Sequence, residues 1–473
     1  MKISLIFPNG FLGKPFRLDI PIHPPLSIAY LAAYLREQKH EVQVIDAMAE
    51  NLSLDKVRER LARFNPDVIG ITTNVSIANK AMMTAKYLRS VHVTVPIIMG
   101  GAWATTEYEL ILRHGFADAV VLGEGEITLG ELVAAIHDRS RWFSIPGLTF
   151  IDDEGATVIT TARPHIEDLD SLPFPAWDIF PNNRRYTIYG RGYPIYPIMT
   201  SRGCPYDCIH CTKHVHGYKF RPRSAENVID EIRFLKERFH VKTILVADDN
   251  FTCDVARCER ILDKIIAQKL NDIHYLCSNG IRADTVSPRL ARKLKEAGFF
   301  YIGIGIESGN QAIVKAIGKK LDLQKVRKAV ALLKEQHIIV CGYFIFGLPQ
   351  DTMKTMEETI EFAKQLKLDY TQFFKAVPIP GTKMYDMIVK EGHFVNVRDG
   401  GDVDGYNVSS ASFEIGKLKA EDVERAFKLS YNRFYLSPIK LLHLISGIRS
   451  LHEANWFFRS LVQLFLKTIV PFA

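Results

Sequence analysis

The chain of 473 residues lacks several features that would assign it to a common class of protein. It contains no low-complexity tract and no repeat of fixed period, and no apolar run reaches the ~20 residues that span a bilayer. The first apolar run is short and ends at Pro8, so we expect a strand there rather than a signal sequence. The net charge of +7, from 60 basic and 53 acidic residues, is too small to indicate nucleic-acid binding.

The sequence also has few cysteines, seven in all, and they do not form the dense framework of a secreted, disulfide-linked domain. We therefore expect a cytoplasmic protein. Three of the seven fall within the eight residues from Cys204 to Cys211. In a reducing compartment such a cluster indicates metal binding or redox chemistry.

Residues 1–140 alternate short β-rich runs with amphipathic helices, which predicts an α/β domain with a doubly wound parallel sheet. Its expected strands are 2–8, 41–46, 67–73, 95–101 and 119–125. Ligands on such sheets bind at the carboxyl ends of the strands, although glycines there can also simply form turns. The candidate binding residues are Asn74, Val75, Ser76, Gly100, Gly101, Thr105, Gly123, Glu124, Gly125 and Glu126.

Residues 141–190 change character: a hairpin is expected over 147–163, followed by a proline-rich linker over 169–181. Residues 191–385 return to strand–helix alternation with six strand–helix units. Six units are too few for a closed eight-stranded barrel, so we expect a partial (β/α)6 barrel with its chemistry at the carboxyl rim.

The region 386–473 is expected to be mainly helical. In its last part, 455–473, Arg459, Gln463 and Lys467 form a narrow polar stripe on an otherwise apolar surface. Such a helix is suited to the inner surface of a membrane, as a peripheral contact, or to packing on the barrel.

Cys204, Cys208 and Cys211 follow the first barrel strand, within TSRGCPYDCIHC. Three thiolates on one short loop can ligate three irons of a [4Fe–4S] cluster and leave the fourth iron open for a small molecule. The competing interpretation is a zinc site completed by His210, His214 or His216.

The stretch TSRGCPYDCIHC resembles the CxxxCxxC signature of the radical S-adenosylmethionine (SAM) enzymes, and the resemblance covers residues 190–385. It implies that SAM binds the open iron and that an electron from the cluster releases a 5′-deoxyadenosyl radical, which abstracts hydrogen from an unactivated carbon. The family's SAM-binding positions correspond to His210, Asp248, Asp249, Arg282, Glu307, Ser308 and Gly347. For each position taken alone, a purely structural role is the alternative.

Two residues on the fifth barrel strand, Cys341 and Tyr343, are candidate hydrogen donors facing the barrel interior. The remaining cysteines, Cys253, Cys258 and Cys277, lack ligand spacing and are expected to be inert thiols.

Preceding such a barrel, the first domain resembles the cobalamin-binding domain of cobalamin-dependent radical SAM enzymes. HPPLSIAYLAAYL and LDSLPFPAWDIF carry this resemblance, which spans residues 1–385 and points to the branch of the anaerobic magnesium-protoporphyrin ester cyclase and the hopanoid enzymes. The Asp-x-His-x-x-Gly loop that supplies a lower histidine ligand to cobalamin in mutases is missing after Asp46.

The resemblance implies three cofactors, a [4Fe–4S] cluster, SAM and cobalamin, and most directly a C-methyltransferase acting on an unactivated carbon of a small molecule or lipid. A reductase, flavodoxin or ferredoxin would supply the electron. Two alternatives are a radical cyclase or carbon–carbon coupling enzyme acting on a lipid or tetrapyrrole, and a non-catalytic regulator that binds cobalamin or zinc.

Overall fold

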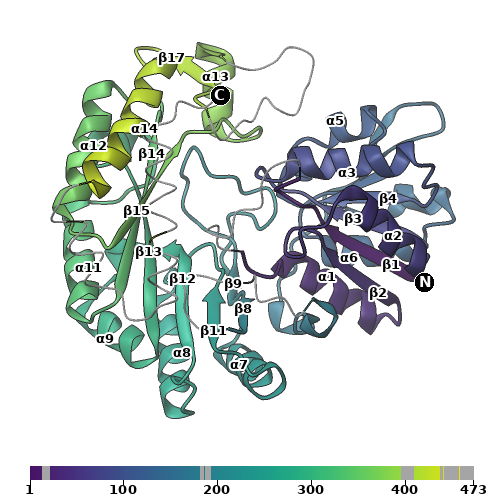
Figure 1. Ribbon diagram of the computed structural model, residues 1–473, viewed down its shortest axis with the longest axis horizontal. Coiled ribbons are helices and arrows are strands. Elements are labelled where there is room, and N and C mark those ends of the chain that lie inside the picture. The colour runs from purple at the N-terminus through teal and green to yellow at the C-terminus, as the bar shows by residue number, and fades with distance from the viewer. Residues whose placement is uncertain are drawn as a thin grey trace.

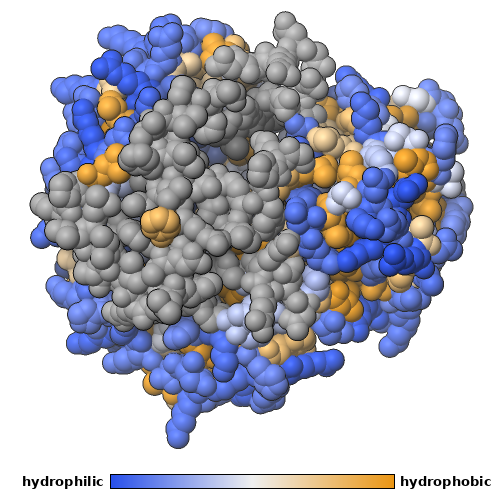
Figure 2. All heavy atoms as spheres, viewed as in Figure 1, coloured by the Kyte–Doolittle hydropathy of each residue, from blue (hydrophilic) through white to orange (hydrophobic). Residues whose placement is uncertain are grey.

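The computed structural model describes residues 1–12, 22–181, 186, 193–395, 410–436, 440 and 458. In this part of the chain two α/β lobes lie side by side, each built on its own sheet (Figure 1). Hydrophilic side chains cover the rim of the second lobe, and hydrophobic patches show on the face of the first (Figure 2).

The first sheet has the strand order β2-β1-β3-β4-β5-β6-β7. Its first five strands are parallel, as predicted. The predicted hairpin is present, but it pairs antiparallel with β5 and so extends this sheet, covering an edge that would otherwise be open. The strands are β1 Lys2–Phe7, β2 Glu41–Asp46, β3 Val68–Thr72, β4 Ile97–Gly100, β5 Ala119–Val121, β6 Leu148–Ile151 and β7 Thr157–Ile159.

Helices cover both faces of this sheet. On one face, Ile28 and Ala32 of α1 share a core with Leu129 and Leu132 of α6. The other four helices form a second core on the opposite face, so the lobe is doubly wound. The helices are α1 Leu26–Glu37, α2 Leu54–Phe64, α3 Ala78–Ser90, α4 Ala102–Thr106, α5 Tyr108–Arg113 and α6 Gly125–Ala134.

The second sheet consists of six parallel strands in the order β15-β14-β13-β12-β11-β8. Because β8 and β15 do not pair with each other, the barrel is open, as predicted. The strands are β8 Ile195–Ile198, β11 Thr243–Val246, β12 His274–Ile281, β13 Phe299–Glu307, β14 Ile339–Phe346 and β15 Tyr370–Lys375; a short antiparallel pair, β9 Ser201–Arg202 and β10 Arg221–Pro222, follows β8.

Local signals in the sequence set the ends of the barrel helices. Ser224 caps α7 by accepting a hydrogen bond from the Asn227 amide, and His240 ends this helix in a left-handed conformation. Thr352 and Thr355 form a reciprocal capping box on α12. The helices are α7 Ala225–Phe239, α8 Val255–Ala267, α9 Pro288–Glu296, α10 Gln311–Ala316, α11 Leu323–Glu335 and α12 Met353–Gln365. Short 3-10 helices are η1 Arg139–Ser144, η2 Leu169–Ser171, η3 Trp177–Ile179 and η4 Ala283–Thr285.

After the barrel, the described residues form α13 Lys383–Glu391, a hairpin of β16 Gly392–Phe394 and β17 Phe413–Ile415, and α14 Ala420–Tyr435. The hairpin interrupts a region expected to be mainly helical. The Tyr435 hydroxyl donates to the Thr371 carbonyl and accepts from its amide, so α14 is held against β15. No helix in the described ranges is long and apolar enough to cross a membrane. The predicted stripe of Arg459, Gln463 and Lys467 lies outside those ranges.

The two lobes share a hydrophobic core. Tyr30 of α1 and Trp177 of the linker belong to the same cluster as Val228 and Ile232 of α7. The linker is further held by a hydrogen bond from the Ala176 amide to the Ala29 carbonyl. The division of the chain at residues 140, 190 and 385 stays a prediction.

Candidate active site

The loop that carries Cys204, Cys208 and Cys211 begins at the end of β9. Gly203 has a φ of +82°, and a Cβ there would lie 2.1 Å from the Lys219 carbonyl oxygen, so only glycine permits this turn. The Cys204 amide donates to the Gly217 carbonyl and the Cys211 amide to the Cys208 carbonyl. The three thiols are therefore displayed on one closed loop, which we call the cysteine loop (residues 203–217).

The cysteine loop is clamped by Arg282, which lies at the end of β12. Its guanidinium lies 3.7 Å from the centre of the Tyr206 ring and makes two 2.9 Å hydrogen bonds to Asp284. It also donates to the carbonyls of Lys319 and Lys320. These contacts occupy Arg282, the residue predicted to meet the carboxylate of SAM, in holding the loop.

Burial raises the pKa of the Cys208 and Cys211 thiols, and the nearby Lys319 and Lys213 ammonium groups act in the opposite direction. Binding to iron would remove these protons. In the described part of the chain, no three His, Cys, Asp or Glu side chains are gathered closely enough to hold a single metal ion. A cubane instead distributes its thiolate ligands over separate irons, a donor set that three cysteines on one loop match.

A cavity of about 520 Å³ occupies the barrel interior next to this loop. Glu307, in a left-handed conformation at the end of β13, forms a 2.6 Å ion pair with Lys319. A Cβ on Gly305 would lie 2.9 Å from the Glu307 carboxylate, so glycine leaves room for this pair. The lining residues are His23, His210, Ser278, Asn279, Gly305, Glu307, Tyr343, Ile345, Gln372 and Phe374.

Two of the predicted SAM contacts in this cavity have groups that suit a ligand. The Nδ1 atom of His210 is buried and has no hydrogen-bond partner among the described residues. Burial lowers the pKa of His210, so its ring is neutral at physiological pH. Burial acts to raise the pKa of Glu307, but the Lys319 ammonium group reverses this and holds it below its usual range as a carboxylate.

Other predicted contacts are occupied within the protein. Asp248 accepts three 2.6 Å hydrogen bonds from Thr200 and Ser201. Ser308 is hydrogen-bonded to Thr359 and Asn310. Asp248 thereby joins the end of β11 to the segment after β8, and Ser308 joins the end of β13 to α12.

The last three predicted residues of the barrel lobe, Gly347, Tyr343 and Cys341, each have different neighbours. A Cβ on Gly347, which has a φ of +84°, would lie 3.0 Å from Val423, so this glycine lets α14 approach. Tyr343 lines the barrel cavity. Cys341 is fully buried behind it, among Leu276 and Tyr301.

A second cavity, of about 390 Å³, lies at the carboxyl edge of the first sheet. Predicted ligand-binding residues at three strand ends line it: Asn74, Gly100, Gly101, Gly123, Glu124, Gly125 and Glu126. Val75, Ser76 and Thr105 do not line it. Thr105 instead accepts a hydrogen bond from the Gly123 amide and donates to the Gly101 carbonyl, joining two of the loops.

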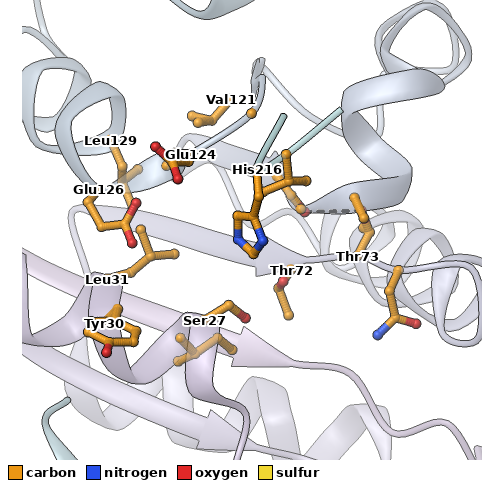
Figure 3. Close-up of a pocket in the computed structure, with 18 of the residues that line it drawn as sticks. Ser27, Tyr30, Leu31, Thr72, Thr73, Val121, Glu124, Glu126, Leu129 and His216 are labelled. Atoms are coloured by element: carbon orange, nitrogen blue, oxygen red, sulfur yellow. Dashed lines mark hydrogen bonds between the residues drawn. The ribbon is translucent and has the colours of Figure 1, made fainter. Parts of the chain in front are cut away.

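The far wall of this sheet-edge cavity comes from the other lobe, including residues 212–217 of the cysteine loop and Asp249. Figure 3 shows His216 of this wall above the strand that ends at Thr72. At Gly123 a Cβ would have only the His214 carbonyl oxygen within 4 Å, at 3.8 Å, so space is open there. The Nε2 atom of His214 is buried and unpaired in the described structure. Open strand-end glycines and an unpaired imidazole fit a large polar cofactor such as cobalamin.

Glu124 and Glu126, also predicted to contact that cofactor, join the two lobes instead. Glu124 lies 3.2 Å from Arg202 and 2.7 Å from Arg221, and Glu126 lies 2.6 Å from Arg202. All four side chains are nearly fully buried. Burial acts to raise the pKa of Glu124, but Arg221 and Arg202 more than offset it, so this group is ionised.

The two cavities share a wall. His210 lines the barrel cavity, while Thr212 and later residues of the same loop line the sheet-edge cavity. Likewise His23 faces the barrel, and Leu26 and Ser27 face the sheet edge. His23 was missed in the sequence, where its only signal is its place at the start of HPPLS.

Known proteins share this combination of parts. The radical SAM superfamily profile matches residues 198–363 and the B12 binding domain profile matches residues 21–133. An uncharacterized methyltransferase of Pyrococcus horikoshii is 33% identical over 93% of this chain and 94% of its own length. The chain belongs to the B12-binding radical SAM family. It is therefore an enzyme, and the cofactors of this family are a [4Fe–4S] cluster, SAM and cobalamin.

Other members of the family are more distant. The anaerobic magnesium-protoporphyrin IX monomethyl ester cyclase of Rubrivivax gelatinosus is 27% identical over 92% of this chain and 78% of its own length. The solved structure of the radical SAM methyltransferase TsrM from Kitasatospora setae, with cobalamin and the cluster bound, aligns with a TM-score of 0.72 over 99% of this chain and 98% of its own, at 17% identity. The cobalamin-dependent SAM radical enzyme OxsB aligns with the same score over 99% of this chain and 72% of its own. These two structures have the same fold as this chain.

Proposed function

We propose that the protein is a cobalamin-dependent radical SAM methyltransferase that adds a methyl group to an unactivated carbon of a small molecule. The observation that carries this proposal is the wall shared by the two cavities, because both are bounded by the cysteine loop and by residues 23–27. A radical made on one side and a methyl donor on the other would then meet the same substrate carbon.

In this proposal Cys204, Cys208 and Cys211 hold the cluster, and no fourth protein ligand closes it. His210 and Glu307 orient SAM in the barrel cavity, and the strand-end glycines of the first sheet hold cobalamin. When bound, these groups supply a carbon-centred radical and a transferable methyl group. His23 and Phe374 also line the barrel cavity in which the substrate would bind.

The lining of the barrel cavity favours a substrate with polar groups. Ser278, Asn279 and Gln372 offer hydrogen-bonding side chains, and Phe374 and Ile345 offer apolar surface. Tyr343 and Cys341 stay candidate hydrogen donors for the alternative reactions, because methyl transfer itself needs no hydrogen atom from the protein. A reductase, flavodoxin or ferredoxin would supply the electron. We also propose that the protein is cytoplasmic, with or without a peripheral membrane contact by residues 455–473.

The proposal is tested by product analysis. Protein reconstituted without oxygen should be brown, and a strong one-electron reductant with SAM should yield both 5′-deoxyadenosine and S-adenosylhomocysteine. 5′-Deoxyadenosine without S-adenosylhomocysteine would favour a cyclase or coupling enzyme, the activity named for the Rubrivivax relative. Protein holding zinc and no iron would favour a regulator and refute the proposal.

The substrate is sought by comparing extracts of cells with and without the protein. Mass spectrometry should find a metabolite whose mass increases by one methylene only when the protein is present. The Cys208→Ala variant is the control, since it should fold but produce no such shift.

A further inference from the structure

His23 lies between two anchored segments of the first lobe. Before it, Ile22 is buried in a core to which strands β8, β11, β12, β13 and β14 of the barrel contribute. After it, Pro24 and Pro25 lead directly into α1. Each proline fixes its own φ, and Pro24 also restricts the backbone of His23 to extended conformations. The position of His23 beside the barrel is therefore set by rigid parts of both lobes.

The imidazole of His23 has a defined arrangement of donor and acceptor. Its Nδ1 atom lies 3.1 Å from the Pro24 carbonyl oxygen. A carbonyl only accepts, so Nδ1 carries the proton in this hydrogen bond. Burial lowers the pKa of His23, so the ring is neutral at physiological pH and Nε2 keeps its lone pair. Within the described part of the chain Nε2 forms no hydrogen bond, and the residue is exposed where it lines the barrel cavity.

The rest of the barrel cavity offers no net charge to a ligand. The Glu307 carboxylate is paired with the Lys319 ammonium group. The side-chain amide of Asn279 donates a 3.0 Å hydrogen bond to the Ala247 carbonyl, which leaves its oxygen as an acceptor. Such a lining suits an uncharged part of a substrate, and an imidazole nitrogen with a lone pair pairs with a donor group of that part.

His23 also lies where the proposed reaction would take place. It lines the barrel cavity, whereas Leu26 and Ser27, a few residues later, line the sheet-edge cavity. A carbon that loses hydrogen on the barrel side and receives a methyl group from the sheet edge would have to lie beside this wall. A group bonded to that carbon would then be within reach of the imidazole.

We propose that Nε2 of His23 accepts a hydrogen bond from a hydroxyl or N–H group of the substrate, carried by the methylated carbon or by the atom next to it. The proposal rests on the proposed function and adds the substrate class, a compound with a donor group beside the reacting carbon. The hydrogen bond holds that carbon at the shared wall, and His23 transfers no proton or electron.

The test compares variants of the reconstituted protein, with cluster and cobalamin bound. A small-molecule extract of cells that lack the protein is the substrate source, and SAM labelled with ¹³C in its methyl group marks the product for mass spectrometry. A dilution series of the extract separates KM from kcat. His23→Leu should lower kcat/KM roughly tenfold, mainly through KM, because it removes one acceptor. His23→Gln, which keeps an acceptor, should restore most of this loss.

Two measurements separate this effect from a loss of structure. 5′-Deoxyadenosine formed from SAM without extract should be equal in the wild type and both variants. His137→Leu, an exposed histidine after α6, is the control and should methylate as the wild type does. Wild-type kinetics in His23→Leu, or a His23→Gln variant as impaired as His23→Leu, would overturn the proposal.

The structure of the wild-type product gives an independent answer that needs no variant. Nuclear magnetic resonance of the purified ¹³C-labelled product should place a hydroxyl or N–H on the methylated carbon or on its neighbour. A methylated product without such a group would refute the inference and leave the proposed function standing. If the wild type forms 5′-deoxyadenosine but neither S-adenosylhomocysteine nor a labelled product with any extract, the proposed function fails and the inference with it.

Discussion

The carboxylate of Glu124, on the first lobe, lies 2.7 Å from the guanidinium of Arg221, on the second. Arg221 belongs to β10, which pairs with β9, the strand that leads into the cysteine loop. This buried ion pair between the lobes therefore fixes the position of the cysteine loop, which forms the far wall of the sheet-edge cavity, relative to the first sheet.

Replacing Glu124 with Gln should destabilise the protein strongly. The change leaves Arg202 and Arg221 buried with one carboxylate fewer, and losing one partner of a buried pair typically costs about 3–5 kcal/mol. Urea unfolding measures the loss. Glu109→Gln, which removes an exposed ion pair with Arg113 on α5, is the matched control and should change little. Equal losses of unfolding free energy in the two variants would show that the buried ion pair contributes no more to stability than the exposed one.

Asp46 should make stability depend on pH. Burial raises its pKa to about 6 in spite of hydrogen bonds from Tyr186 and the Ala49 amide. Because the folded pKa lies above the unfolded value of about 3.9, the folded state takes up the proton first, and acid favours folding through this group. Relative to Asp46→Asn, the wild type should gain roughly 2 kcal/mol between neutral pH and about pH 4.

Denaturant midpoints of the two proteins across this pH range measure that difference. The exposed Asp153, in the turn between β6 and β7, provides a control, since Asp153→Asn should follow the wild type. A wild-type curve parallel to that of Asp46→Asn would contradict the raised pKa.

Cys208→Ala should lose the cluster and all SAM cleavage, because two thiolates cannot hold a cubane that needs three. Cys253 is the informative control. It is near enough to Cys204 for their charges to interact, and burial raises its pKa to about 11. Cys253→Ser should keep the iron and the 5′-deoxyadenosine product. Loss of iron in that variant would mean that Cys253 is a further ligand of the cluster.

Arg282→Lys should weaken retention of the cluster rather than affinity for SAM. Lysine keeps the charge but loses the paired bonds to Asp284 and the flat contact with Tyr206. Iron per chain and the rate at which the brown colour fades in air measure this effect, with the exposed Arg289→Lys as control. A raised KM for SAM with full iron content would support the direct carboxylate contact instead.

Much of the fold could be predicted because its signals are local. Short β-rich runs indicated the strands of both sheets, and the caps of α7 and α12 lie at Ser224 and Thr352, within a few residues of the helices that they begin. The hairpin was also predicted. Its pairing with β5 was not, because pairing depends on which edge is open when the chain folds.

The site was predicted less completely. Spacing alone indicated the three cysteines, since a loop that short must bring its thiols together. The placement of Arg282, Ser308 and Gly347 depends on residues 37 to 76 positions away in the chain, namely Lys319, Thr359 and Val423. His23 was overlooked for the same reason, as nothing near it in the chain indicates that it reaches the barrel.

Short-range patterns in the amino-acid order were enough to establish two strand–helix domains and a three-thiolate loop, because hydrogen bonding and apolar periodicity act over a few residues. Folding decided which polar groups stay available to a ligand. Glu124 is taken by Arg202 and Arg221, whereas Nδ1 of His210 has no hydrogen-bond partner among the described residues. That outcome depends on burial and charge pairing between distant segments, which only the assembled lobes bring within reach of one another.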